Sequence, residues 1–365
     1  MAGSSFGTIF HITTWGESHG PGIGVVIDGC PSGIKLCEAD IQSYLDRRRP
    51  GQSKYSTMRN ESDQADILSG VFEGKTTGTP ISILIKNTDQ RSHDYGQIKD
   101  CYRPGHADYT FDAKYGFRDY RGGGRSSGRE TIGRVAAGAV AARFLECLGI
   151  RVSAYTKSIG PVRIPSDEYD LSAVFKNPLY MPHLGYSKKA EAYLKECMSS
   201  DDSAGGVIEC RIDGLPAGIG EPVFDKLDAL LAQSVMSIGA VKGFEVGDGF
   251  RSSLSRGSSN NDAFCIKDGH PAKKTNHSGG VLGGISDGST ILFRASIKPT
   301  PSILSSQHTI TKEWKETELS IKGRHDPVIV PRAVVVVESM AAITVTDLLL
   351  RNMCASMNRI IDFYS

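Results

Sequence analysis

The sequence Gly124-Arg125-Ser126-Ser127-Gly128-Arg129-Glu130-Thr131 leads from a glycine-rich segment into a long apolar stretch at 132–148. The spacing of the apolar residues predicts a buried helix there. Ser127 and Glu130 have the spacing of a capping box, which places the helix N-terminus directly after the glycines. The free N–H groups and the dipole at a helix N-terminus favour binding of an anion. A glycine-rich surface turn with solvated arginines is the alternative. Three nearby arginines supply forked cationic donors: Arg125, Arg129 and Arg134.

The rest of the chain mixes strand and helix patterns without a steady alternation. Apolar stretches bounded by glycine or proline predict strands at 24–27, 81–85, 207–212, 291–297 and 333–337. Helical spacing recurs at 38–45, 190–198, 224–236 and 340–357. The polar stretch 251–278 is typical of a long surface excursion, and no linker or low-complexity tract divides the chain. We therefore predict one α+β domain that spans residues 1–365.

Composition limits the classes of partner. The 42 Lys+Arg against 41 Asp+Glu give no overall field for nucleic acid or an anionic membrane, so any basic site must be local. The N-terminus lacks the pattern of a signal peptide, and no stretch approaches 18 uninterrupted apolar residues, which favours a cytoplasmic protein. The cysteines form no Cys-x-x-Cys pair and the histidines no His-x-x-x-His, so we expect reduced thiols and no metal site.

Several other loops combine glycine or proline with Arg, Ser or His, as anion-binding loops do. His19, His106 and His325 all lie in such turns and are candidates for proton transfer, although each alone is more typical of a structural histidine. The basic run 47–49 could equally be a helix C-terminus that offsets the dipole. The segment Lys298-Pro299-Thr300-Pro301-Ser302 suits the rim of a cofactor pocket or a plain proline turn. No Gly-Lys-Ser or Gly-Lys-Thr follows the glycines, so a nucleotide-binding P-loop is not supported.

Taken together, these segments resemble the chorismate synthase family over nearly the whole chain. Three blocks carry the resemblance: Gly16-Glu17-Ser18-His19-Gly20-Pro21-Gly22-Ile23-Gly24, the block that begins at Gly124, and Arg324-His325-Asp326-Pro327 running on to Glu338. The resemblance implies a β-α-β sandwich with helices packed between antiparallel sheets, and a homotetramer. It also implies a lyase of the shikimate pathway, in aromatic amino acid biosynthesis. That enzyme eliminates phosphate from 5-enolpyruvylshikimate-3-phosphate and requires reduced flavin mononucleotide (FMN) without net redox change.

The resemblance also implies roles for single residues. The residues implied to transfer protons are His19, His106, Asp326, Ser18 and Ser127. Those implied to bind the anionic groups of the substrate are Arg48, Arg129, Arg134 and Arg332. Those implied to contact the flavin are Arg125, Ser126, Ser127, Gly239, Ala240, Gly283, Lys298, Pro299, Thr300, Pro301, Ser302 and Arg324. Lys54 stands where the family commonly has arginine, and lysine cannot make the forked contact with an anion.

Two alternatives predict different behaviour. A flavin oxidoreductase that turns over a nicotinamide would oxidise its flavin stoichiometrically when substrate is added. An RNA-binding surface would interleave aromatic residues with the arginines, whereas none flanks residues 47–49. Within the family resemblance, NAD(P)H could serve as a direct reductant, or an external flavin reductase could supply the reduced flavin. The absence of a long insertion favours the external reductase.

Overall fold

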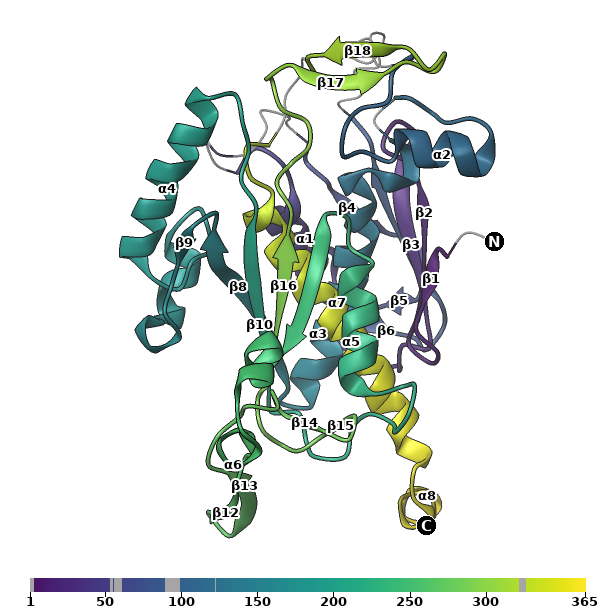
Figure 1. Cartoon of the computed structure of the whole chain (residues 1–365). Helices are drawn as coiled ribbons and strands as arrows, with labels where there is room; N and C mark the ends of the chain where they lie inside the picture. The colour runs from purple at the N-terminus through teal and green to yellow at the C-terminus, as the bar shows by residue number, and fades with distance from the viewer. Residues whose placement is uncertain (1–2, 53–54, 56–60, 89–98, 122, 322–325) are drawn as a thin grey trace.

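The computed structural model describes residues 3–52, 55, 61–88, 99–121, 123–321 and 326–365. Two five-stranded sheets, antiparallel throughout, lie on either side of a layer of helices (Figure 1). The first sheet has the order β1 (Ser5–Phe6), β2 (His11–Gly16), β3 (Gly22–Asp28), β7 (Ile81–Lys86) and β4 (Ala65–Ile67). The second has the order β11 (Val241–Val246), β16 (Ile291–Ile297), β10 (Gly206–Asp213), β8 (Arg151–Ile159) and β9 (Val162–Arg163).

The helical layer is built around α3 (Thr131–Cys147) and α7 (Val330–Arg351), which pack against each other. Helix α3 faces β3 and β2, and α7 faces β8 and β10. At Gly138 a Cβ would lie 2.2 Å from Cβ of Ser339, so the close contact of the two helices requires glycine there. Helix α1 (Glu38–Arg48) packs on both, and α5 (Leu227–Met236) packs on α7 and β11. The predicted α+β class, with helices between antiparallel sheets, is confirmed.

Alternating side chains give each sheet one face for the helices. On β7, Ile81, Ile83 and Ile85 are fully buried, while the intervening residues are partly exposed. On β16, Ile291, Phe293 and Ala295 point into the same core. This period of two is the pattern of a half-buried antiparallel strand. Residues of both sheets belong to one continuous hydrophobic cluster.

The predicted strand at 333–337 is wrong, because these residues form the first part of α7. The helix begins at Val330 and ends at Arg351, so the predicted range 340–357 covered its second half and ran past its end. The run Val334–Val337 is buried on all sides between α3 and the second sheet, so it has no polar face to reveal the helical period. The helix is long and apolar enough to cross a membrane, but nearly all of it is buried in the core.

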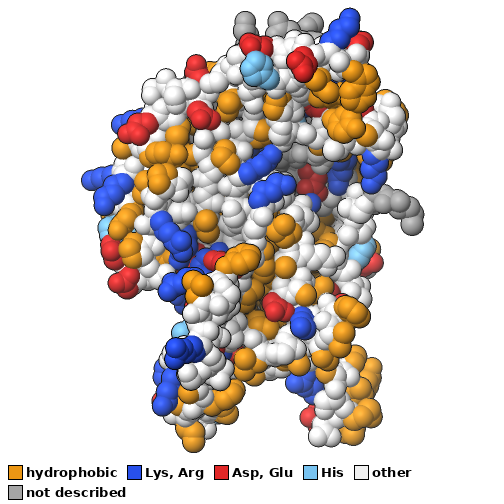
Figure 2. All heavy atoms as spheres, viewed as in Figure 1, with side chains coloured by type: hydrophobic (Ala, Val, Ile, Leu, Met, Phe, Trp, Pro, Cys, Tyr) orange, Lys and Arg blue, Asp and Glu red, His pale blue; other side chains and the backbone are white. Residues whose placement is uncertain are grey.

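The other elements lie around the sandwich. Helix α4 (Leu184–Ser199) begins six residues before its predicted start at 190, and α5 begins three residues after its predicted start at 224. Residues 251–278 do form an excursion, which carries α6 (Gly257–Asn260), β12 (Phe264–Lys267) and β13 (His270–Lys273). It projects beside α8 (Met357–Tyr364), and both projections expose hydrophobic side chains (Figure 2). The remaining elements are α2 (Asp108–Tyr115), β5 (Val71–Phe72), β6 (Lys75–Thr76), β14 (Val281–Leu282), β15 (Ile285–Ser286), β17 (Gln307–Ile310), β18 (Glu316–Leu319) and short 3-10 turns.

Candidate active site

Several of the loops singled out in the sequence lie at one end of the sandwich. The β2–β3 turn, the N-terminal ends of α3 and α7, and the segment after β16 all lie toward α2 and the β17–β18 hairpin (Figure 1). Hydrogen bonds and ion pairs connect these segments, although they are far apart in the sequence.

The β2–β3 turn presents Ser18 and His19. The N–H of Gly20 donates to the carbonyl of Glu17 at 3.1 Å, so Ser18 and His19 are the two central residues of a four-residue turn. The hydroxyl of Ser18 is buried and lies 3.1 Å from Nδ1 of His19. A Cβ at Gly16, which has φ +85°, would lie 2.2 Å from the carbonyl oxygen of Gly22, so the tight entry to this turn requires glycine.

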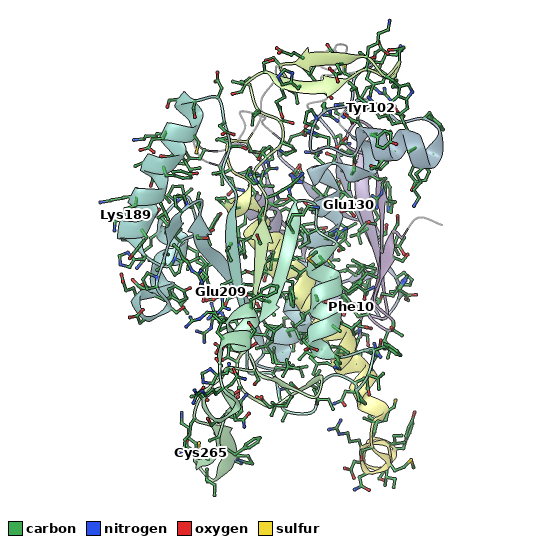
Figure 3. All side chains as sticks on the ribbon, in the orientation of Figure 1. Phe10, Tyr102, Glu130, Lys189, Glu209 and Cys265 are labelled. Carbon is green, nitrogen blue, oxygen red and sulfur yellow. The ribbon has the colours of Figure 1, made fainter. Side chains whose placement is uncertain are left out.

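The predicted capping box before α3 forms only in half. Ser127 caps a 3-10 turn (Gly128–Glu130) by accepting from the N–H of Arg129 at 3.3 Å. The carboxylate of Glu130 does not reach back to Ser127; it accepts from Thr14 Oγ1 and from Arg134 Nε, each at 2.8 Å. Figure 3 shows Glu130 at the end of α3 nearest to α2. Glu130 therefore ties α3 to the first sheet.

A cluster of arginines and carboxylates lies behind the turn. Nη1 of Arg129 lies 3.3 Å from Glu61 and 3.2 Å from Asp63. Asp63 also lies 3.6 Å from Nη2 of Arg48. Arg332 contacts Asp326 at 2.5 Å and donates through Nε to the carbonyl of Arg48 at 3.0 Å. The structure thus brings together Arg48, Arg129, Arg332 and Asp326, all of them predicted site residues.

Arg48 differs from the other arginines of the cluster. Its side chain is 2% exposed, yet Nε, Nη1 and Nη2 make no hydrogen bond within the described part of the chain. Burial lowers the pKa of Arg48 to about 9, against the attraction of Asp63 and with the repulsion of Arg332 and Arg129. The guanidinium therefore remains cationic at neutral pH. Burying a cation without hydrogen bonds costs free energy, so we expect a ligand to supply the missing acceptors.

His106 lies in the loop before α2. Its Nδ1 is 3.0 Å from the carbonyl of Pro104, and its Nε2 is 2.8 Å from the hydroxyl of Ser302. Burial, and then the positive charge of Arg103, lowers the pKa of His106 to about 4. Arg103 is itself fixed by Asp108 through two 2.8 Å hydrogen bonds. The imidazole is therefore neutral at neutral pH.

The segment after β16 contacts the loop that carries His106. Nζ of Lys298 donates to the carbonyl of Gly105 at 2.7 Å, and the backbone N–H of Lys298 donates to the carbonyl of Ala240 at 2.9 Å. Burial and the neighbouring Lys242 lower the pKa of Lys298. Oγ1 of Thr300 is buried and has no hydrogen-bond partner among the described residues. Ser302 and Asp326 both line one small cavity of about 150 Å³.

The other predicted site residues that the structure describes lie outside the arginine cluster. Arg134 donates to Ser237, two residues before Gly239, at 2.5 Å, so it lies beside the predicted flavin contacts at 239–240. Gly283 is not brought to the cluster: Gly284 accepts from the first residue of α5, whereas Ala240 follows the other end of that helix. Arg125 donates to the carbonyl groups of Gly16 and Thr14, and Ser126 to that of Gly123. Lys54, Arg324 and His325 lie outside the described residues.

Sequence reasoning missed three polar residues of the site. Glu61 and Asp63 hold Arg129, and Asn87 accepts from the same arginine at 2.7 and 3.0 Å. Asn87 directly follows β7, where polar residues often mark a site at a strand end. That signal was present in the sequence, but the pairing of β7 with β3, which brings Asn87 to the β2–β3 turn, was not.

Comparisons with a family model, with related sequences and with a solved structure all indicate the same family. The family model for chorismate synthase matches residues 10–350. A chorismate synthase of Agathobacter rectalis is 63% identical over 364 residues, which cover 100% of this chain and 99% of that protein. One of Methanocella arvoryzae is 54% identical, covering 95% and 94%. A solved structure of a chorismate synthase, 30% identical, superposes with a TM-score of 0.76 over 97% of this chain and 95% of that one.

Proposed function

The chain belongs to the chorismate synthase family, and we propose that the cluster of arginines and histidines described above is its active site. The enzyme is a lyase that removes phosphate from 5-enolpyruvylshikimate-3-phosphate. In this 1,4-anti elimination the C3–O bond breaks with loss of phosphate, and C6 loses a proton, giving chorismate. The protein must therefore bind a phosphate and two carboxylates, and it must move protons at two places.

The observation that carries the proposal is the buried guanidinium of Arg48. Its three nitrogens have no hydrogen bond among the described residues, and they can each donate to a phosphate or carboxylate oxygen. Arg129, Arg134 and Arg332 complete the proposed anion contacts. Arg129 and Arg332 are fixed by Glu61, Asp63 and Asp326, so these carboxylates hold the forks in place before substrate arrives.

Proton transfer is assigned to His19, His106, Asp326 and the two serines Ser18 and Ser127. His19, with Ser18 3.1 Å from its Nδ1, would give a proton to the departing phosphate. His106 is neutral and hydrogen-bonded, so it is suited to accept or relay a proton. Asp326 assists removal of the C6 proton while Arg332 keeps its carboxylate oriented. Ser127, at the start of α3, supports these transfers.

The residues fit reduced FMN. The buried hydroxyl of Thr300 has no partner in the described chain, and a polar ligand at this rim would satisfy it. Reduced FMN, when bound, supplies electron density that eases loss of phosphate from an allylic carbon. Gly283 lies away from the cluster, so it could contact a flavin only across a subunit boundary. The proposed contacts within one chain are Arg125, Ser126, Ser127, Gly239, Ala240, Lys298, Pro299, Thr300, Pro301, Ser302 and, outside the described residues, Arg324.

Assembly and supply of the cofactor complete the proposal. We infer a single domain over residues 1–365 that forms a cytoplasmic homotetramer, as the family resemblance implies. Reduced flavin would come from NAD(P)H on the enzyme itself or from an external flavin reductase. No nucleic acid or membrane partner is proposed.

Two adjacent arginines provide the test of the site. Arg48→Lys removes the forked donor from the buried position, and Arg47→Lys is its control because Arg47 is already bound to Glu338 by two 2.8 Å hydrogen bonds. We expect Arg48→Lys to weaken substrate binding at least about 30-fold, roughly 2 kcal/mol, in equilibrium titration. Arg47→Lys should lower the melting temperature but leave affinity within about threefold. Equal affinities for the two variants would place the substrate elsewhere.

A further inference from the structure

Asn87 occupies the junction between the arginine cluster and the turn that carries His19. It follows β7, which pairs with β3, and its backbone N–H extends that pairing by donating to the carbonyl of Pro21 at 3.1 Å. Its Nδ2 donates to the carbonyl of Glu17 at 2.9 Å and to that of Gly20 at 2.8 Å. One residue thus holds three carbonyls, at 17, 20 and 21, around His19.

Arg129 fixes the orientation of the Asn87 amide. Oδ1 of Asn87 accepts from Nε of Arg129 at 3.0 Å and from Nη2 at 2.7 Å. Because a guanidinium only donates, the oxygen of the amide must face it, and the NH2 group must face the two carbonyls. The opposite orientation would set Nδ2 against the cationic fork and Oδ1 against two acceptors. Arg129 is held in turn by Glu61 and Asp63.

We infer that Asn87 is a positioning residue for His19, which transmits the fixed position of Arg129 to the β2–β3 turn. The inference rests on the proposed role of His19 in the elimination. Ser18 and His19 are the central residues of a turn whose first and last carbonyls are both bound by Nδ2. When these two hydrogen bonds are lost, the carbonyls of Glu17 and Gly20 are no longer held by the side chain that Arg129 orients, while the internal Gly20-to-Glu17 bond and the bond from the Asn87 backbone remain. The imidazole then samples more positions, and a proton-transfer group that is misplaced by about 1 Å loses much of its rate advantage.

Two substitutions at Asn87 separate the two sides of its side chain. Asn87→Ala removes the bonds to Arg129 and to the turn together. Asn87→Asp keeps an acceptor for Arg129 but replaces the donor to the carbonyls of Glu17 and Gly20 with a second acceptor. Both variants retain the backbone bond to Pro21.

Asn177 supplies the matched control. Its Nδ2 also donates to two backbone carbonyls, those of Ala173 and Met181, each at 2.8 Å, and its Oδ1 also accepts from several donors. It is half-buried like Asn87 but lies in the segment before α4, outside the proposed active site. Asn177→Asp therefore measures what the loss of such bonds does to stability alone.

The experiment measures kcat, substrate dissociation constants, melting temperature and the NMR signals of His19, assigned with His19→Gln. We expect both Asn87 variants to lose at least about tenfold in kcat and to shift or broaden the His19 signals, and Asn87→Ala to bind substrate within about threefold of wild type. Asn177→Asp should lower the melting temperature as much while leaving kcat and the His19 signals unchanged.

Three results would overturn the inference. They are a wild-type kcat in Asn87→Asp, unchanged His19 signals in that variant, or an equal loss of kcat in Asn177→Asp. If His19→Gln itself keeps the wild-type rate, the proposed role of His19 fails, and this result is distinct because it does not depend on Asn87.

Discussion

Nε2 of His106 lies 2.8 Å from the hydroxyl oxygen of Ser302, and this contact joins the loop before α2 to the segment after β16. The carbonyl of Pro104, 3.0 Å from Nδ1, can only accept, so Nδ1 carries the proton and Nε2 accepts from Ser302. The neutral tautomer is thereby fixed from both sides. Protonation of His106 would turn Nε2 into a donor and force the Ser302 hydroxyl to rotate.

The lowered pKa of His106 predicts a loss of stability in acid. Between the ordinary pKa of 6.5 and the folded value of about 4, the unfolded chain binds a proton that the folded chain does not. Stability from this group is therefore complete above pH 6.5 and falls as pH decreases toward 4, by up to roughly 3 kcal/mol. His106→Gln should flatten that part of the curve in urea unfolding. The exposed His308 is the control, and equal curves for wild type and His106→Gln would contradict the buried neutral imidazole.

Asp326→Asn tests charge at nearly constant shape. The amide cannot accept a proton, and it weakens the contact with Arg332. We expect turnover to fall at least about tenfold while substrate affinity stays within about threefold, as for an interaction made mainly in the transition state. The kinetic isotope effect for deuterium at C6 should increase. A lower melting temperature with an unchanged isotope effect would indicate that Asp326 only braces Arg332.

Arg134→Ala should weaken binding of the phosphorylated substrate by about 2 to 4 kcal/mol, with a much smaller effect on flavin affinity. The contacts with Glu130 and Ser237 orient Arg134 through Nε and Nη1, and Nη2 makes no hydrogen bond to the described residues. Arg143→Ala, on the same helix, is the control because Arg143 is bound to Glu146 away from the cluster. Equal losses in the flavin and substrate titrations would assign Arg134 to the flavin site or to the fold.

Gly138→Ala tests the packing of the helical layer. The added Cβ would lie 2.2 Å from Cβ of Ser339, so α3 and α7 must separate. Overpacking of this kind should lower the free energy of unfolding by about 1 to 3 kcal/mol. A Cβ at Gly257 would have no atom within 4 Å, and Gly257→Ala should change stability by less than about 0.5 kcal/mol. Equal unfolding midpoints for the two variants would refute the close helix contact.

Local sequence patterns are enough to predict the alternating strands and the loops that carry His19, His106 and Asp326. They do not predict which distant residues contact these loops. The run Val334–Val337 is compatible with a strand or with a helix buried on all sides, and only the packing on α3 decides between them. Asn87 and Asp63 acquire their roles through Arg129, which is distant from both in sequence. Similarly, the distance of Gly283 from Ala240 follows from the direction of α5, which no local pattern records.

Anaerobic turnover with chemically reduced FMN tests the central claim most directly. The purified chain is mixed with reduced FMN and 5-enolpyruvylshikimate-3-phosphate, while phosphate, chorismate and the visible flavin spectrum are followed together. We expect many equivalents of phosphate and chorismate to form in equal amounts per flavin, with the flavin still reduced at the end. Oxidation of one flavin for each substrate consumed would contradict the account and identify an oxidoreductase, and failure to release phosphate would contradict the elimination itself.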